Sequence, residues 1–193
     1  SIVSYLATDI LQGGRLAAGR LAELLGGKGT VLLLRYQEGS ASTMDRERGF
    51  LEEMREQHPG IRVISSDQYA GPTRETAKRA AENLLNRYGA ELQGAFTPNE
   101  SSTIGVLLAL QDLGRAGKVH HIGFDAAQSL VAALRSRELG GLVVQNPMRM
   151  GYLGVRMMVD HLRGRPVERT VDTGVMLVTP GNMDTPEAKE LLN

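Results

Sequence analysis

The chain has 193 residues, 41% of them hydrophobic and 23% charged, so it is long enough to bury a core and has the composition of an ordinary globular protein. Lysine plus arginine equals aspartate plus glutamate at 22 each, and a formal charge of zero gives no overall electrostatic reason to expect a nucleic-acid or membrane partner. Cysteine is absent, which excludes thiol catalysis, thiolate metal sites and disulfide bonds.

Short runs rich in β-branched residues alternate along the chain with longer amphipathic stretches. The predicted strands lie at 1–8, 30–35, 61–65, 92–97, 119–124 and 142–145, and a last extended run lies at 171–179. The predicted helices lie at 12–25, 42–57, 73–88, 101–113, 126–137 and 147–162, and the tail from Pro180 is polar. This alternation predicts an α/β fold, a three-layer doubly wound parallel sheet with crossover helices. A capping-box pattern, Ser42-x-x-Asp45, is predicted to open the second helix.

In open sheets of this kind, ligands bind beyond the carboxyl ends of the strands. The polar or aromatic side chains at or after those ends are Thr8, Arg46, Tyr69, Asn99, Asp125 and Gln145. They suit a polyhydroxylated ligand, because a carboxylate accepts from two hydroxyls, a guanidinium donates to two oxygens and an amide does one of each. A tyrosine adds an apolar face for sugar C–H groups.

Five of these six residues also have a purely structural alternative. Asn99 and Asp125 precede helices and could cap them. Arg46 lies among charged residues on a helix, where a solvated side chain is the default. Gln145 could belong to a turn, and Tyr69 could cover the core. The residue types alone leave both interpretations open.

Five short motifs occur in order along the chain: Ala7-Thr8-Asp9-Ile10-Leu11-Gln12-Gly13-Gly14, Gly39-Ser40 with Arg46-Glu47-Arg48-Gly49-Phe50, Phe96-Thr97-Pro98-Asn99-Glu100, His121-Ile122-Gly123-Phe124-Asp125, and Val144-Gln145-Asn146-Pro147. Together they resemble the type I periplasmic sugar-binding proteins, the group of the ribose-binding protein, over essentially all 193 residues. The resemblance implies that the sugar is hydrogen-bonded by Arg46, Asn99, Asp125 and Gln145, with Tyr69 as an aromatic position on the same lobe and Thr8 as a hinge-side polar contact. Ile10 stands where the family usually has Asn, a departure that affects one hinge hydrogen bond.

The resemblance also implies two lobes that close around the ligand, of which this sequence carries parts. Residues 1–145 are expected to form the C-terminal ligand-binding lobe, with a hinge strand at 1–9. Residues 146–173 are expected to belong to the N-terminal lobe, and residues 174–193 to return to the C-terminal lobe. Most of the N-terminal lobe is not in the sequence, so we expect the apolar helix at 147–162 to need cover from that lobe or from a second chain.

The function implied by the resemblance is that of a receptor which captures a pentose, hexose or related polyol and delivers it to the membrane permease of an ABC-type importer. The first residues show no signal peptide, so the periplasmic or extracytoplasmic location comes from the resemblance alone. Residues 171–187 are similar to the tail of import receptors, which favours import over the alternative, the effector-binding core of a LacI-type transcription repressor.

An α/β enzyme is the third class of function considered. No nucleophile–base pair can be assembled from the sequence, and the four histidines lack the spacing of metal ligands. We therefore expect no enzymatic activity, no cofactor, no metal and no nucleic-acid partner.

Overall fold

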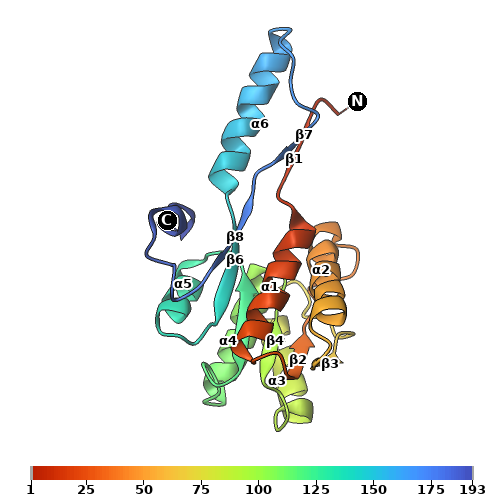
Figure 1. The fold of residues 1–193 in the computed structure, drawn as a ribbon, viewed down its shortest axis with the longest axis vertical. Coiled ribbons are helices and arrows are strands. Elements are labelled where there is room, and N and C mark those ends of the chain that lie inside the picture. The colour runs from red at the N-terminus through yellow and green to blue at the C-terminus, as the bar shows by residue number, and fades with distance from the viewer. Residues whose placement is uncertain (1, 193) are drawn as a thin grey trace.

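The computed structural model describes residues 2–192. Its main body is a six-stranded sheet with the strand order β3-β2-β4-β5-β6-β8 (Figure 1). The strands are β2 (Gly29–Leu33), β3 (Ile61–Ser65), β4 (Gly94–Phe96), β5 (His120–Phe124), β6 (Gly141–Gln145) and β8 (Val175–Val178). Strands β2 to β6 pair in parallel, and β8 pairs antiparallel with β6. All the carboxyl ends of the parallel strands therefore meet at one edge of the sheet.

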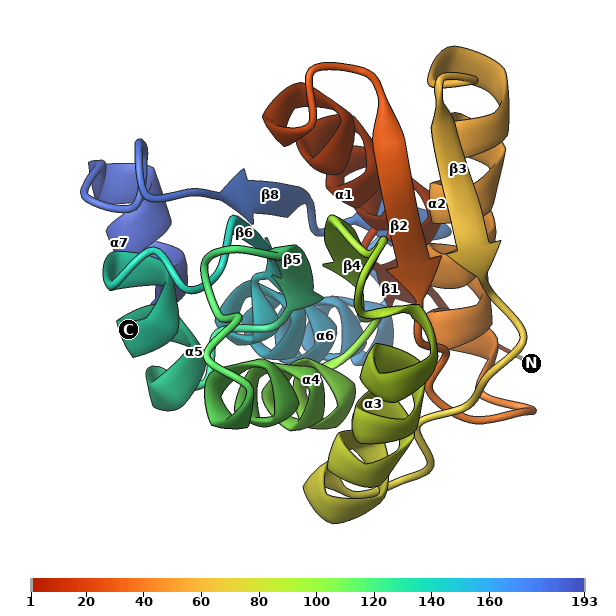
Figure 2. The ribbon, with the colours of Figure 1, turned by 90° about the horizontal axis from the view of Figure 1, so that it is seen from below.

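Helices cover both faces of this sheet (Figure 2). The helices of the described chain are α1 (Ile10–Leu24), α2 (Ala41–Gln57), α3 (Arg74–Tyr88), α4 (Glu100–Asp112), α5 (Gln128–Arg135), α6 (Pro147–Leu162), which lies apart from the sheet, and α7 (Pro186–Leu192). Helices α1 and α2 pack on one face, while α3, α4 and α5 pack on the other. The predicted three-layer α/β fold with a parallel sheet is confirmed.

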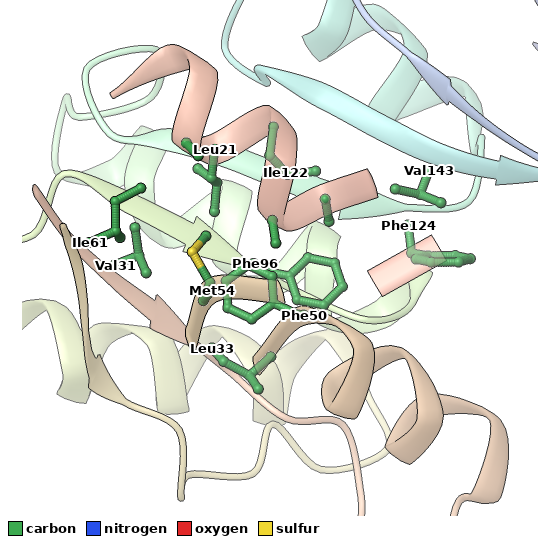
Figure 3. Packing of buried hydrophobic residues seen from close by; sticks show 13 residues of the cluster. Leu21, Val31, Leu33, Phe50, Met54, Ile61, Phe96, Ile122, Phe124 and Val143 are labelled. Atoms are coloured by element: carbon green, nitrogen blue, oxygen red, sulfur yellow. The ribbon is translucent and has the colours of Figure 1, made fainter. Parts of the chain in front are cut away.

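The core between the sheet and the α1–α2 layer contains three phenylalanines (Figure 3). Phe50 of α2 stacks on Phe96 of β4, with ring centroids 4.7 Å apart and an interplanar angle of 21°. Phe124, at the end of β5, is fully buried beside Val143 of β6. Burial of such rings stabilises the fold by about 2–3 kcal/mol each, and here it also anchors the strand ends.

Helices α1 and α2 cross with their backbones in near contact. A Cβ added at Gly14 of α1 would lie 2.0 Å from the carbonyl oxygen of Arg46, and one added at Gly49 of α2 would lie 2.1 Å from the carbonyl oxygen of Leu11. Real Cβ atoms essentially never approach other atoms this closely. The two glycines therefore allow the close crossing that sets the position of Arg46.

A second, smaller unit stands apart from the main sheet (Figure 1). It consists of the parallel pair β1 (Tyr5–Ala7) and β7 (Thr170–Asp172) together with α6. None of the residues of α6, all of which the structure describes, is buried, and Met148 and Leu162 are 84% and 77% exposed. That residues 146–173 belong to another lobe stays a prediction. That the other lobe or a second chain covers α6 also stays a prediction.

Several sequence predictions need correction. The strand predicted at 1–8 is limited to β1, outside the main sheet. The extended run predicted at 171–179 breaks at Gly174, where a φ of 82° ends β7, and its continuation β8 joins the other sheet. The predicted capping box is wrong, because α2 begins at Ala41 after Ser40, which makes no side-chain cap.

The polar tail also contains an unpredicted helix, α7. Ala188 of this helix and Met183 before it are buried against the α5 side of the sheet. Seven residues are too few for a clear helical pattern, so tertiary packing decides this element.

Candidate ligand-binding site

Arg46 is buried at the carboxyl edge of the sheet, with 7% of its surface exposed. Its Nη1 donates to the carbonyl oxygen of Pro98 at 2.7 Å, and its guanidinium carbon lies 3.8 Å from the centroid of the Phe124 ring. Its Nε is buried and has no hydrogen-bond partner within residues 2–192. The alternative of a solvated helix residue is therefore wrong for Arg46.

Asp125 follows β5 and joins three elements at that edge. Its Oδ2 accepts from the backbone N–H of Glu100 at the start of α4, at 3.1 Å, and its Oδ1 accepts from Nε2 of Gln145 at the end of β6, at 3.3 Å. Its own φ of 71° lies in the left-handed region, which is uncommon for residues other than glycine, although aspartate adopts it more readily than most. Asp125 does cap a helix, but the helix is α4, which lies before it in the chain, and not the helix that follows it.

Burial dominates the electrostatics of the Arg46–Asp125 pair. Desolvation raises the pKa of Asp125, against the opposing effects of Arg46, the Gln145 amide and the Glu100 N–H. Desolvation also lowers the pKa of Arg46, against the attraction of Asp125, although an arginine stays charged. Both groups are thus held away from water with hydrogen-bonding capacity to spare, the condition in which a polar ligand gains most from pairing with them.

Asn99 and Gln145 complete the polar cluster. Asn99 is the N-cap residue of α4 but makes no side-chain cap; its Nδ2 donates to Oγ of Ser101 at 2.9 Å, and its Oδ1 accepts from Oγ of Ser102. The Gln145 side chain donates to Asp125 and, in the described chain, makes no hydrogen bond of its own to the turn that follows β6. The neighbouring Asn146 caps α6 instead, since its side chain accepts from the N–H of Arg149 at 2.8 Å.

The other two predicted site residues form hydrogen bonds with residues outside this cluster. Tyr69 is 41% exposed, and its hydroxyl accepts from Nη1 of Arg35 at 3.2 Å. The Thr8 hydroxyl is buried and shares a hydrogen bond of 3.2 Å with the hydroxyl of Thr173, next to the β1–β7 pair. The structure thus groups four of the six predicted residues and leaves the other two outside that group.

Three residues of the edge were missed as candidates. The Phe124 ring supports the Arg46 guanidinium, and Arg35, just past β2, pairs with the buried carboxylate of Glu47, Nε to Oε2, at 3.3 Å. Burial raises the pKa of Glu47, opposed by the N–H of Tyr36 and by Arg35. Arg35 is the last residue of a predicted strand, and Glu47 and Phe124 lie within two of the five motifs. Their positions in the sequence could therefore have identified all three as candidates.

A hollow of about 550 Å³ opens beside Asp125 and Gln145, with Glu100 and Met150 also in its lining. Within residues 2–192, no three histidine, aspartate or glutamate side chains gather as metal ligands. No helix of the described chain combines the length and apolar character needed to cross a membrane.

An α/β lobe with a buried polar cluster at the carboxyl ends of its parallel strands matches the architecture of one lobe of a periplasmic-type binding protein. Residues 1–166 match the family described as periplasmic binding protein domain, and the chain belongs to this family. The resemblance to its type I sugar-binding members is confirmed by the relatives and solved structures that match.

The ribose import binding protein of Haemophilus influenzae is 28% identical over 179 residues, which are 93% of this chain and 59% of that protein. A carbohydrate transporter solute binding protein from Agrobacterium radiobacter, solved with D-arabinose, superposes with a TM-score of 0.94 at 34% identity, over 100% of this chain and 66% of that one. A solute binding protein from Agrobacterium vitis with D-fucose gives 0.92 at 33% identity, over 98% and 64%. The chain therefore spans less than two thirds of the length of these proteins.

Proposed function

We propose that the protein is a receptor that captures a sugar between two lobes, outside the cytoplasm, and delivers it to the permease of an ABC-type importer. In this proposal the chain supplies one wall of the cleft, with Arg46, Asn99, Asp125 and Gln145 as the groups that hydrogen-bond the sugar. The role is ligand capture rather than catalysis. The names of the matching proteins, which are sugar-binding components of importers, support this assignment.

The observation that carries the proposal is the buried contact set of Arg46 and Asp125. Within residues 2–192, each carboxylate oxygen of Asp125 accepts a single hydrogen bond and keeps lone pairs for ligand hydroxyls. Nε of Arg46 is an unpaired buried donor within the described chain. An acceptor and a donor that are both desolvated and both under-used fit adjacent hydroxyl and ring oxygens of a pyranose or furanose.

Thr8 and Tyr69 are proposed to contribute from the margins of the cleft. Thr8 lies where the chain passes from β1 into α1, a position suited to a hinge contact. Tyr69 is exposed and held through Arg35, so its ring is available to a ligand or to the opposite lobe.

The proposal is tested by calorimetric titration of the full-length product of the gene with D-ribose, D-arabinose, D-fucose and D-allose. We expect Arg46→Gln to weaken the binding of the preferred sugar by roughly 100-fold, because hydrogen bonds from a charged donor to the ligand are lost. Arg48→Gln is the matched control, since Arg48 lies on the same helix with its side chain 59% exposed and pairs with Asp45. Equal affinities of the two variants, or no binding of any sugar by the natural protein, would contradict the proposal.

The 193-residue chain by itself is expected to bind sugar very weakly or not at all. One wall of a cleft provides only part of the hydrogen bonds, and ligand burial by a second wall is lost. A dissociation constant tighter than about 1 µM for this chain alone would refute that expectation.

A further inference from the structure

Three fully buried polar side chains form a continuous chain of hydrogen bonds directly beneath the polar cluster. They are Thr97 after β4, Thr103 in α4 and His121 in β5, each with 0% of its surface exposed. Nε2 of His121 lies 2.8 Å from Oγ1 of Thr97, which lies 2.9 Å from Oγ1 of Thr103. Thr103 then contacts the carbonyl oxygen of Asn99 at 2.7 Å and the backbone N–H of Phe124 at 3.1 Å.

The hydrogen-bond roles in this chain follow from its two ends. The Asn99 carbonyl can only accept, so the Thr103 hydroxyl donates to it, and the Phe124 N–H can only donate, so Thr103 accepts from it. The Thr103 proton is then used, and Thr97 must donate to Thr103. Thr97 in turn accepts from His121, which must carry its proton on Nε2.

The remaining imidazole nitrogen fits this arrangement. Nδ1 of His121 is buried without a hydrogen-bond partner in the described chain, as an unprotonated nitrogen in an apolar setting would be. Burial lowers the pKa of His121 to about 3, so the ring is neutral at physiological pH and keeps a single N–H. The chain therefore runs in one direction, from His121 to the Asn99 carbonyl.

The backbone is shaped to bring Thr103 against β5. A Cβ at Gly123 would lie 2.1 Å from Cγ2 of Thr103, so only glycine leaves room for this side chain. The Thr103 hydroxyl thus ties the peptide of Asn99 to the peptide of Phe124, the residue before Asp125. This single oxygen atom is linked to the backbone of Asn99 and to the backbone of the residue before Asp125.

We propose that Thr103, oriented by His121 through Thr97, is a positioning residue that sets Asn99 and Asp125 at the spacing needed to bind a sugar. The inference rests on the proposed function for its ligand and extends it to residues that do not touch that ligand. A simple packing role would require only the volume of the Thr103 side chain, whereas positioning requires its hydroxyl.

The test compares Thr103→Val, which keeps the shape but removes the hydroxyl, with Thr103→Ser, which keeps the hydroxyl. In the full-length product of the gene, we expect Thr103→Val to weaken the binding of the tightest of D-ribose, D-arabinose, D-fucose and D-allose by about tenfold or more, and Thr103→Ser to stay within about threefold of the natural protein. Val106→Ala, a buried change on the same helix outside the hydrogen-bond chain, controls for lost stability. Natural affinity in Thr103→Val, measured where it is folded, overturns the proposal.

A second measurement needs no ligand. The Glu100 N–H donates to Asp125 and belongs to the Asn99–Glu100 peptide, whose carbonyl accepts from Thr103, so its hydrogen exchange reports how firmly Asp125 and that peptide are held together. We expect this amide to exchange about tenfold faster in Thr103→Val than in Val106→Ala, and the imidazole ¹⁵N shifts of the natural protein to show the Nε2–H form. Unchanged exchange, or the Nδ1–H form, overturns the positioning role. Failure of every sugar to bind, with the expected exchange result, instead overturns the proposed function, while the role of the Thr103 hydroxyl in holding the Asn99–Glu100 peptide against Asp125 stands.

Discussion

The close crossing of α1 and α2 makes a quantitative prediction for Gly14→Ala. The new Cβ would lie 2.0 Å from the Arg46 carbonyl oxygen and 2.7 Å from the Phe50 nitrogen, so the helices must separate by about 1 Å to reach the 3.0 Å limit of real Cβ contacts. Both neighbours are backbone atoms, which cannot turn aside as a flexible side chain can. Overpacking of this kind costs about 3 kcal/mol, at the upper end of the usual range.

Helix propensity acts in the opposite direction and must be subtracted. Alanine is favoured over glycine in a helix by about 1 kcal/mol, so the net loss for Gly14→Ala is about 2 kcal/mol. Gly19 on the same helix has no neighbouring atom within 4 Å of its would-be Cβ, and Gly19→Ala should stabilise the protein by up to about 1 kcal/mol. The two variants should therefore differ by about 3 kcal/mol.

Urea unfolding followed by far-ultraviolet circular dichroism measures this difference. We expect the midpoint to move to lower urea for Gly14→Ala and to higher urea for Gly19→Ala, with the slopes unchanged. A Gly14→Ala protein as stable as Gly19→Ala would show that the helices are not in backbone contact. The reasoning from the α1–α2 crossing would then be refuted.

Two further predictions concern pH. The folded pKa of His121, about 3, lies below its unfolded value of about 6.5, so its contribution to stability is full above pH 6.5 and falls by about 1.4 kcal/mol per pH unit as the pH decreases towards 3. The free energy of unfolding of His121→Gln, measured against pH, should lack this decrease. Equal pH dependence of the free energy of unfolding in the variant and the natural protein would contradict the prediction. Burial raises the pKa of Asp125, and only its ionised form accepts at both oxygens, so sugar affinity should fall as pH falls through that pKa. In Asp125→Asn, titration at several pH values should show weaker binding without this pH dependence, and a retained dependence would assign it to another group.

Much of the fold could be predicted from the sequence, because alternating strand and helix patterns are local properties of the chain. The strand ends were located well enough to select Arg46, Asn99, Asp125 and Gln145, which the structure gathers at one edge of the sheet. Parallel strands bring their carboxyl ends together whatever their order, so this grouping needs no knowledge of the detailed packing. The ligand-binding role of these residues stays a prediction.

Other features depend on contacts between distant segments and could not be predicted. The run at 171–179 is uniformly extended, yet only pairing partners decide that β7 joins β1 while β8 joins β6. Helix α7 forms because Ala188 has a core to pack against. Neither outcome has a local signal, since strand pairing and burial are set by residues far away in sequence.

The sequence by itself therefore determined the fold class, the family and the edge of the sheet where a ligand would bind, because periodicity and motif order express them directly. The tertiary structure alone decided that Arg46 is buried rather than solvated, and that Asp125 caps α4 rather than its own helix. It also decided that Thr103 fills the space left by Gly123. These features arise where two backbones approach closely, and the missing Cβ that permits the approach has a meaning only when its neighbour is known.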